Sequence, residues 1–171
     1  MSILTAVDGE TVPSDAIEVG YELARQFDEE LVVLHVMPED TFEELREATG
    51  GGGSGSLPLT TADISYGRQA DWPVDSADAD EQFSIQDAEA EAARIAERAV
   101  EGTIDDPVDV TTSGRVGAAV EEILGEADRL DARYLVIGGR KRTPVGKAMF
   151  GSTTQSVLLN TDRPVMTVMH D

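Results

Sequence analysis

The chain of 171 residues is long enough for one domain around a single hydrophobic core. It has no cysteine, which excludes disulfides and thiolate metal ligands, and its 34 acidic against 13 basic residues, a formal net charge of -21, argue against a basic surface for nucleic acid. Repulsion among so many carboxylates is screened at molar salt, so the composition is typical of a cytoplasmic protein from a salt-loving organism.

The first part of the chain contains two short apolar runs separated by an amphipathic segment. Residues 3–7 predict a strand that ends at the Asp8-Gly9 turn, and residues 31–36 predict a second strand. The segment between them predicts a helix, because four of its residues share one face: Ala16, Gly20, Leu23 and Phe27. Unbroken apolar runs indicate strands covered on both faces, as in a parallel sheet. The opening residues lack a basic region, and no apolar run is long enough for a bilayer, so we expect no signal peptide and no membrane span.

Residues 38–81 depart from this regular pattern and predict a long insertion after the second strand. Its beginning suits a short helix with Asp40 as N-cap and Gly50 past its end. The glycine-rich run that follows has the composition of a flexible linker. Residues 50–81, which include Trp72, show no periodicity, and we expect them to be either disordered or a lid over a functional site.

The second half of the chain returns to alternating helices and strands. The patterns first predict a helix that begins with a capping box at Ser84 and Asp87, and then a strand at 108–112. The next helix has five residues on one face: Val116, Val120, Ile123, Ala127 and Leu130. A buried strand at 134–137, a helix from Ser152 to Asn160 and a last strand after Pro164 follow. Strands that alternate with helices predict a single α/β domain over residues 1–171, with a parallel, doubly wound sheet of five strands and helices on both faces.

The stretch GGRKRTPVGKAMFGST, residues 138–153, contains four of the 13 basic residues, Arg140, Lys141, Arg142 and Lys147. It follows a predicted strand, and parallel α/β sheets bind ligands beyond the carboxyl ends of their strands. Two glycines, Gly138 and Gly139, would allow a sharp turn and close approach of a ligand to the backbone.

The end of this stretch predicts an anion site. Gly151 precedes a helix whose first N–H groups have no partner within the helix, and such groups attract phosphate. Ser152 and Thr153 add hydroxyl groups, and the basic side chains add charged donors. The alternative is that the basic residues neutralise neighbouring carboxylates and that Ser152 only caps the helix.

The sequence resembles the universal stress protein family, of haloarchaeal type, over most of its length. The likeness rests on the first strand ending in VDG, on LVVLHV, on LVIGG, on the helix that begins at GST, and on the closing PVMTV. The resemblance implies an adenine-nucleotide α-hydrolase-like fold with strand order 3-2-1-4-5. It also implies a homodimer that pairs through the C-terminal strand, residues 164–169.

Nucleotide-binding members of this family carry G-x2-G-x9-G-[ST]. Gly138 matches the first glycine and Gly151-Ser152 match the end, whereas Lys141 replaces the second glycine. The resemblance implies ATP or a related adenine nucleotide as ligand, with Mg²⁺ bridging its phosphates. The implied nucleotide-binding residues are Ala6, Val7, Asp8, Val36, Gly138, Gly139, Arg140, Lys141, Gly151, Ser152 and Thr153. From the residues alone, Asp8 equally suits a turn beside Gly9.

These observations predict a nucleotide-binding regulatory protein of the stress response. Two alternatives remain: a nucleotide-free dimeric interaction protein, in which Lys141 marks loss of binding, and a slow ATPase, in which Asp8 helps to hold a metal ion. We identify no general base, no catalytic residue and no metal-ligand spacing, so we expect at most slow ATP hydrolysis. His35 is expected to be a packing residue at the end of a strand, and His170 to lie at a mobile terminus.

Overall fold

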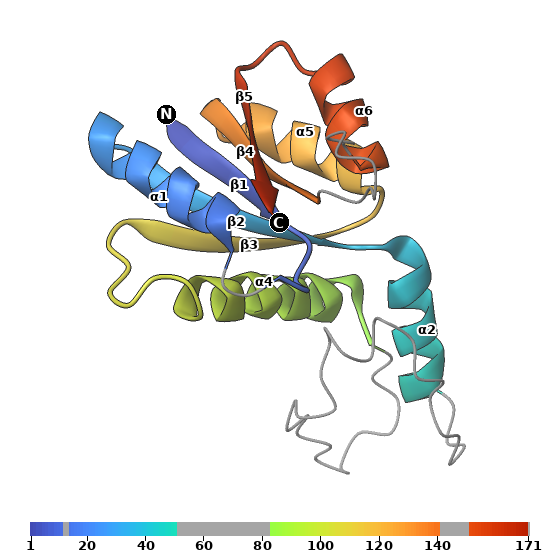
Figure 1. Cartoon of the computed structure of the whole chain (residues 1–171). Helices are drawn as coiled ribbons and strands as arrows, with labels where there is room; N and C mark the ends of the chain where they lie inside the picture. The colour runs from blue at the N-terminus through green and yellow to red at the C-terminus, as the bar shows by residue number, and fades with distance from the viewer. Residues whose placement is uncertain (12–13, 51–82, 141–150, 171) are drawn as a thin grey trace.

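The computed structural model describes residues 1–11, 14–50, 83–140 and 151–170. Within these residues, five parallel strands form one sheet in the order β3-β2-β1-β4-β5 (Figure 1). The strands are β1 (Ser2–Val7), β2 (Glu30–Met37), β3 (Val110–Val116), β4 (Ala132–Arg140) and β5 (Val165–His170). The predicted fold class and strand order are confirmed.

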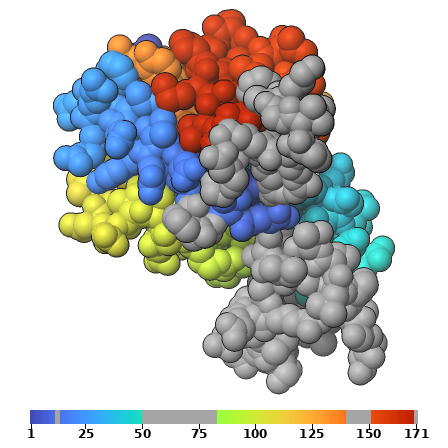
Figure 2. Space-filling model, in the orientation of Figure 1, coloured from blue at the N-terminus to red at the C-terminus, as the bar shows by residue number. Residues whose placement is uncertain are grey.

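Helices cover both faces of the sheet. They are α1 (Asp15–Phe27), α2 (Glu39–Gly50), α4 (Ile85–Glu101), α5 (Ala119–Arg129) and α6 (Ser152–Asn160). One buried cluster joins α1 and α4 to one face of the sheet, and a second joins α5 and α6 to the other. Helix α2 extends past the sheet at the periphery of the molecule (Figures 1 and 2), and packs through Phe42 and Leu45 against a smaller cluster that includes Met37 and Phe83.

The unbroken apolar run of β2 follows from its position inside the sheet. Leu31 and Val33 point to the cluster of α1 and α4, whereas Val32 and Leu34 point to the cluster of α5 and α6. All four are buried, because successive side chains of a strand alternate between the two faces and both faces are covered. The same reason explains why the sequence pattern of this strand indicated a parallel sheet.

The start of α4 is where local sequence signals were most informative. The Ser84 hydroxyl accepts from the Asp87 backbone N–H at 3.2 Å, and the Asp87 carboxylate accepts from the Ser84 N–H at 2.8 Å. These reciprocal bonds are the capping box that the sequence predicts, and they satisfy donors that the first turn of a helix leaves without partners.

Several predicted boundaries were wrong: the strand expected at 108–112 is Val110–Val116, and in two cases pairing with a neighbouring strand decided the outcome. Val116 belongs to β3, where it pairs with Met37, and the helix after it begins only at Ala119. Strand β4 continues through Gly138 and Gly139 to Arg140 instead of turning after Ile137, because these residues pair with β5. Short-range periodicity could not reveal either pairing.

The insertion is described in part. Residues 39–50 form α2, so a helix is present where one was expected, but Asp40 lies in its first turn instead of at the N-cap and Gly50 is its last residue instead of following it. Residues 51–82, including Trp72, lie outside the described residues. The lid and the disordered segment therefore remain predictions. Among the helices that the structure describes, none has the length and apolar character needed to cross a bilayer.

Candidate functional site

The chain leaves β1 and β4 in opposite directions, although the two strands are neighbours at the centre of the sheet. Strand β1 is followed through α1 by β2 on one side, and β4 is followed through α6 by β5 on the other. Ala6 of β1 pairs with Ile137 of β4, so the residues that come next, Val7 and Gly138, reach the same edge. The carboxyl ends at such a switch point are where parallel α/β sheets bind ligands.

Asp8 follows β1 at this edge and organises the turn after it. Its Oδ1 accepts hydrogen bonds from the backbone N–H groups of Glu10 at 3.0 Å and Thr11 at 3.2 Å, and its Oδ2 accepts one from the Thr11 hydroxyl at 3.5 Å. Gly9 has a φ of 77°, a left-handed conformation that favours glycine. Asp8 therefore has the geometry of a turn residue, one of the two interpretations that the sequence allows.

Two of the other expected residues lie on the α5 and α6 side of the sheet. Ala6 and Val36 are half-buried and pack at the margin of that cluster, whereas Val7 packs on the α1 and α4 side. The carboxyl ends of β1 and β2 thus present a small apolar surface on the α5 and α6 side, level with the Asp8 turn.

The beginning of α6 lies against the end of β4. The buried Thr154 hydroxyl donates to the Gly138 carbonyl at 3.4 Å. Gly151 is the N-cap of α6, and Ser152 is exposed while Thr153 is half-buried in the first turn. The first N–H groups of a helix have no acceptor within the helix, so these donors lie beside the end of β4, where an anion could bind them.

Packing among the described residues does not require glycine at Gly138, near the end of β4, or at Gly151, just before α6. A β-carbon on Gly151 would meet no described atom within 4 Å, and one on Gly138 would meet only the Ala16 Cβ at 3.9 Å. Gly151 has an ordinary φ of -60°. Gly139 differs, because a β-carbon there would lie 2.7 Å from the Met169 Sδ. The backbone at Gly138 and Gly151 is therefore open to close approach from outside the described protein.

The remaining expected residues fall at or beyond a boundary of the described chain. Arg140 is the last residue of β4 and pairs with His170, and Lys141 lies outside the described residues together with the rest of the basic loop up to residue 150. The expected role of Lys141 in place of a motif glycine therefore remains a prediction.

His35 contributes more to this edge than the sequence suggested. It is buried, as expected of a packing residue, and its Nδ1 lies 3.1 Å from the Val7 carbonyl oxygen. Burial lowers the pKa of His35, and Arg98 lowers it further, against the opposing effects of the Val7 hydrogen bond and the Asp8 carboxylate. The alternation of β2 puts His35 on the same strand face as Val33, but only the pairing of β2 with β1 brings it level with Val7.

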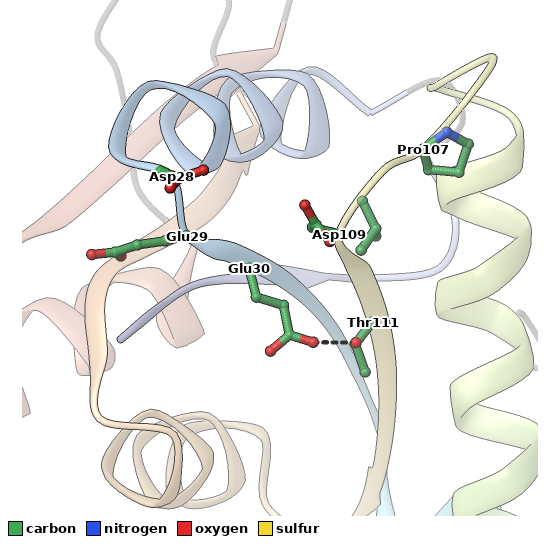
Figure 3. A pocket seen from close by; sticks show the side chains of 7 residues that line it. Asp28, Glu29, Glu30, Pro107, Asp109 and Thr111 are labelled. Atoms are coloured by element: carbon green, nitrogen blue, oxygen red, sulfur yellow. Dashed lines mark hydrogen bonds between the residues drawn. The ribbon is translucent and has the colours of Figure 1, made fainter.

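A hollow at the opposite, amino end of the sheet has the wrong chemistry for an anion. Figure 3 shows it with the residues that line it: Asp28, Glu29, Glu30, Pro107, Asp109, Val110 and Thr111. The carboxylates of Glu29 and Glu30 point away from each other, and Glu30 accepts a hydrogen bond from the Thr111 hydroxyl. Glu29 instead pairs with Arg133 at 3.0 Å. No group of three His, Cys, Asp or Glu side chains among the described residues is arranged to hold a metal ion.

Comparison with known proteins gives one family. Residues 57–169 match the family model of the universal stress protein family. A universal stress protein from Mycolicibacterium smegmatis is 50% identical over 50 residues, which cover 29% of this chain and 38% of that protein. The matched stretch thus spans well under half of that relative.

Solved structures with the same fold cover nearly the whole chain. A universal stress protein from Archaeoglobus fulgidus is similar with a TM-score of 0.52 and 25% identity, over 98% of this chain and 97% of that chain. A hypothetical protein whose biochemical function was assigned from its structure is similar with a TM-score of 0.54 and 17% identity, over 100% and 98% of the two chains. An Archaeoglobus fulgidus structure in complex with dAMP has a TM-score of 0.47 and 21% identity, over 98% and 96%.

Proposed function

The chain belongs to the universal stress protein family, and from this premise we propose that it is a stress-response regulatory protein that binds an adenine nucleotide, ATP or a close relative, and acts as a homodimer. The proposed site is the edge formed by the carboxyl ends of β1, β2 and β4 and the first turn of α6. We propose no catalytic residue, and at most slow hydrolysis.

One observation carries the nucleotide proposal: the first turn of α6 lies against the end of β4, with glycine at both Gly138 and Gly151 where the described packing would accept a β-carbon. Glycines without a packing role are understandable if a ligand approaches the backbone there. Phosphate suits the place because the first N–H groups of α6 lie beside this edge, and Ser152 and Thr153 in the same first turn would add hydroxyl donors.

The other parts of the edge suit the rest of the nucleotide. The half-buried side chains of Ala6 and Val36 would contact the adenine ring, and Asp8 is exposed at a position where it would accept hydrogen bonds from ribose hydroxyls. Mg²⁺ would be carried by the phosphates, whose negative charge it would reduce near this acidic protein.

The test is isothermal titration of the purified protein with MgATP at molar salt, together with a thermal shift at millimolar MgATP. Saturable heat and a raised melting temperature are expected, because a ligand that binds only the folded state stabilises it. The absence of both would reject the nucleotide proposal.

The geometry of Asp8 favours one alternative, a nucleotide-free interaction protein of the same family. The carboxylate is already engaged by its own turn, and Lys141 stands where nucleotide-binding members have glycine. Titration of a Lys141→Gly variant separates the two proposals. Binding of MgATP by this variant but not by the natural protein would establish the nucleotide-free alternative.

We also propose that the homodimer forms through β5 and that the protein works in a salt-rich cytoplasm of haloarchaeal type. Strand β5 is an outer strand of the sheet, and such an edge offers unpaired backbone groups to a second copy. The formal net charge of -21 supports the salt-rich compartment. A melting temperature that fails to rise between low and molar KCl would contradict the latter proposal.

A further inference from the structure

The imidazole of His35 lies beside the end of β1, on the face of the sheet that α1 and α4 cover. His35 pairs with Val7 across the two strands, and the residue is only 4% exposed. The Nδ1 of this ring lies 3.1 Å from the Val7 carbonyl oxygen. Because a carbonyl only accepts hydrogen bonds, the proton lies on Nδ1, and the ring donates to the last backbone carbonyl of β1.

The same ring also packs under Gly9. A β-carbon on Gly9 would lie 3.1 Å from the His35 Cε1 and 3.3 Å from its Nδ1, and 2.6 Å from the Ile95 Cγ2 of α4. The loop after β1 therefore lies directly on the His35 ring and on Ile95. The ring contacts the residues on both sides of Asp8, one by a hydrogen bond and the other by packing.

We propose that His35 is a positioning residue for the Asp8 turn, and so for the ribose side of the nucleotide site; the consequence for the ligand rests on the function proposed above. With the Val7 carbonyl fixed and Gly9 supported from below, the turn directs the Asp8 carboxylate toward the N–H groups of Glu10 and Thr11.

The charges around the ring agree with a neutral donor. The loop after β1 contributes Asp8, and α4 contributes Arg98, which lies 3.8 Å from the carboxylate of the buried Glu91. On β3, the residue level with His35 is Gly114, which has no charge. Burial lowers the pKa of His35, so the ring is uncharged near neutral pH and keeps its single proton for Val7.

Three substitutions separate the hydrogen bond from the packing. Asparagine places an amide N–H near the position of Nδ1, whereas glutamine reaches toward the position of Nε2 and leucine fills the space without a donor. The readout is amide hydrogen exchange at Glu10 and Thr11 in the ligand-free protein, measured by NMR. Because one hydrogen bond is lost, exchange should be about tenfold faster in His35→Leu and His35→Gln. In His35→Asn it should remain close to the natural rate.

A matched control distinguishes positioning from general loosening. Thr5 is buried on the same face of β1 as Val7, two residues earlier, and its hydroxyl has no hydrogen-bond partner among the described residues. Thr5→Val should therefore leave exchange at Glu10 and Thr11 unchanged. Equal rates in the asparagine and glutamine variants, or faster exchange in Thr5→Val, would overturn the inference. If His35→Leu does not fold, the comparison of exchange rates in His35→Asn and His35→Gln still tests the role of the hydrogen bond.

Titration with MgATP then connects the turn to the ligand. We expect His35→Gln to weaken MgATP binding about tenfold and His35→Asn to retain it, since the first loses one orienting hydrogen bond. Natural protein that binds no MgATP would reject the proposed function, whereas the exchange rates of the ligand-free variants would still decide whether His35 positions the turn. Unchanged affinity in His35→Gln, in a protein that binds, would overturn the link to the site.

Discussion

Arg115 donates two hydrogen bonds to Glu126, from Nε at 3.1 Å and from Nη2 at 2.9 Å, and so joins β3 to α5. The Glu126 carboxylate also accepts from the Ser113 hydroxyl at 3.0 Å and from Arg129. Glu126 is only 3% exposed, so the bonds replace the water that the carboxylate loses on folding. Arg115 reaches α4 as well, through Glu89 at 3.5 Å.

The first prediction follows from the acidity of this buried carboxylate. Burial raises the pKa of Glu126, but bonds from Arg129, Arg115 and Ser113 outweigh it and bring the pKa from 4.5 to about 2. A carboxylate whose pKa is lowered on folding stabilises the fold at pH values above its unfolded pKa, and that contribution is lost as the pH falls from about 4.5 toward 2.

The measurement is the urea unfolding free energy of the natural protein and of Glu126→Gln between pH 7 and pH 2.5. The difference between the two proteins should be largest near pH 7 and should shrink below about pH 4.5. A difference that does not change with pH would contradict the pKa shift. Taking the difference removes the general effect of neutralising other carboxylates.

The second prediction concerns the close contact between β3 and α4 at Gly114. A β-carbon there would lie 2.0 Å from the Glu89 carbonyl oxygen and 2.4 Å from the Ala93 backbone nitrogen, neither of which can rotate away. Gly114→Ala should therefore cost about 3 kcal/mol of unfolding free energy, as overpacking of a core does. Gly125→Ala is the control, because the exposed Gly125 of α5 has no described atom within 4 Å of such a carbon.

Urea unfolding followed by circular dichroism checks this pair of variants. Gly125→Ala should stabilise the protein by about 0.5–1 kcal/mol, since alanine favours a helix interior over glycine. A Gly114→Ala variant as stable as the natural protein would show that α4 can move away from β3.

The third prediction tests the proposed phosphate position without disturbing the fold. A β-carbon on Gly151 would meet no described atom within 4 Å, and the backbone conformation is ordinary, so we expect Gly151→Leu to change the melting temperature little. The leucine would cover the first N–H groups of α6, and MgATP affinity should fall more than about tenfold, as expected for blocked charge-assisted hydrogen bonds.

Gly125→Leu is the matched control for this experiment, since it makes the same chemical change at another exposed glycine whose β-carbon would meet no described atom within 4 Å. Isothermal titration at molar salt should give natural affinity for this control. Natural affinity in Gly151→Leu as well would place the phosphates elsewhere.

The fourth prediction tests pairing through β5. The Leu135 N–H donates to the Pro164 carbonyl at 3.0 Å, and backbone groups of a strand alternate in direction, so the N–H of Thr167 points away from β4. Thr167→Pro removes this outward donor and leaves the bonds to β4 intact. Light scattering after gel filtration should therefore show a monomer, whereas the control Thr167→Ala should remain a dimer. A dimeric Thr167→Pro protein would exclude pairing through this edge.

The parts of the expected site that depend on residues close together in the sequence could be predicted from it, whereas contacts between distant segments could not. The turn at Asp8-Gly9 and the helix beginning at Ser152 depend on interactions within a few residues. The contact of His35 with Val7 could not be predicted from the sequence, because the two residues are 28 positions apart along the chain. The nucleotide-binding role of all these residues stays a prediction.

The sequence by itself determined the alternation of strands and helices, the capping box at Ser84 and the burial of both faces of β2, because periodicity, caps and apolar runs act over short distances. Only the tertiary structure decided that Gly138 lies in a strand, that the His35 ring contacts the Val7 carbonyl, and that Glu126 meets Arg115. These features are contacts between segments far apart in sequence, and their partners become neighbours only when the sheet has assembled.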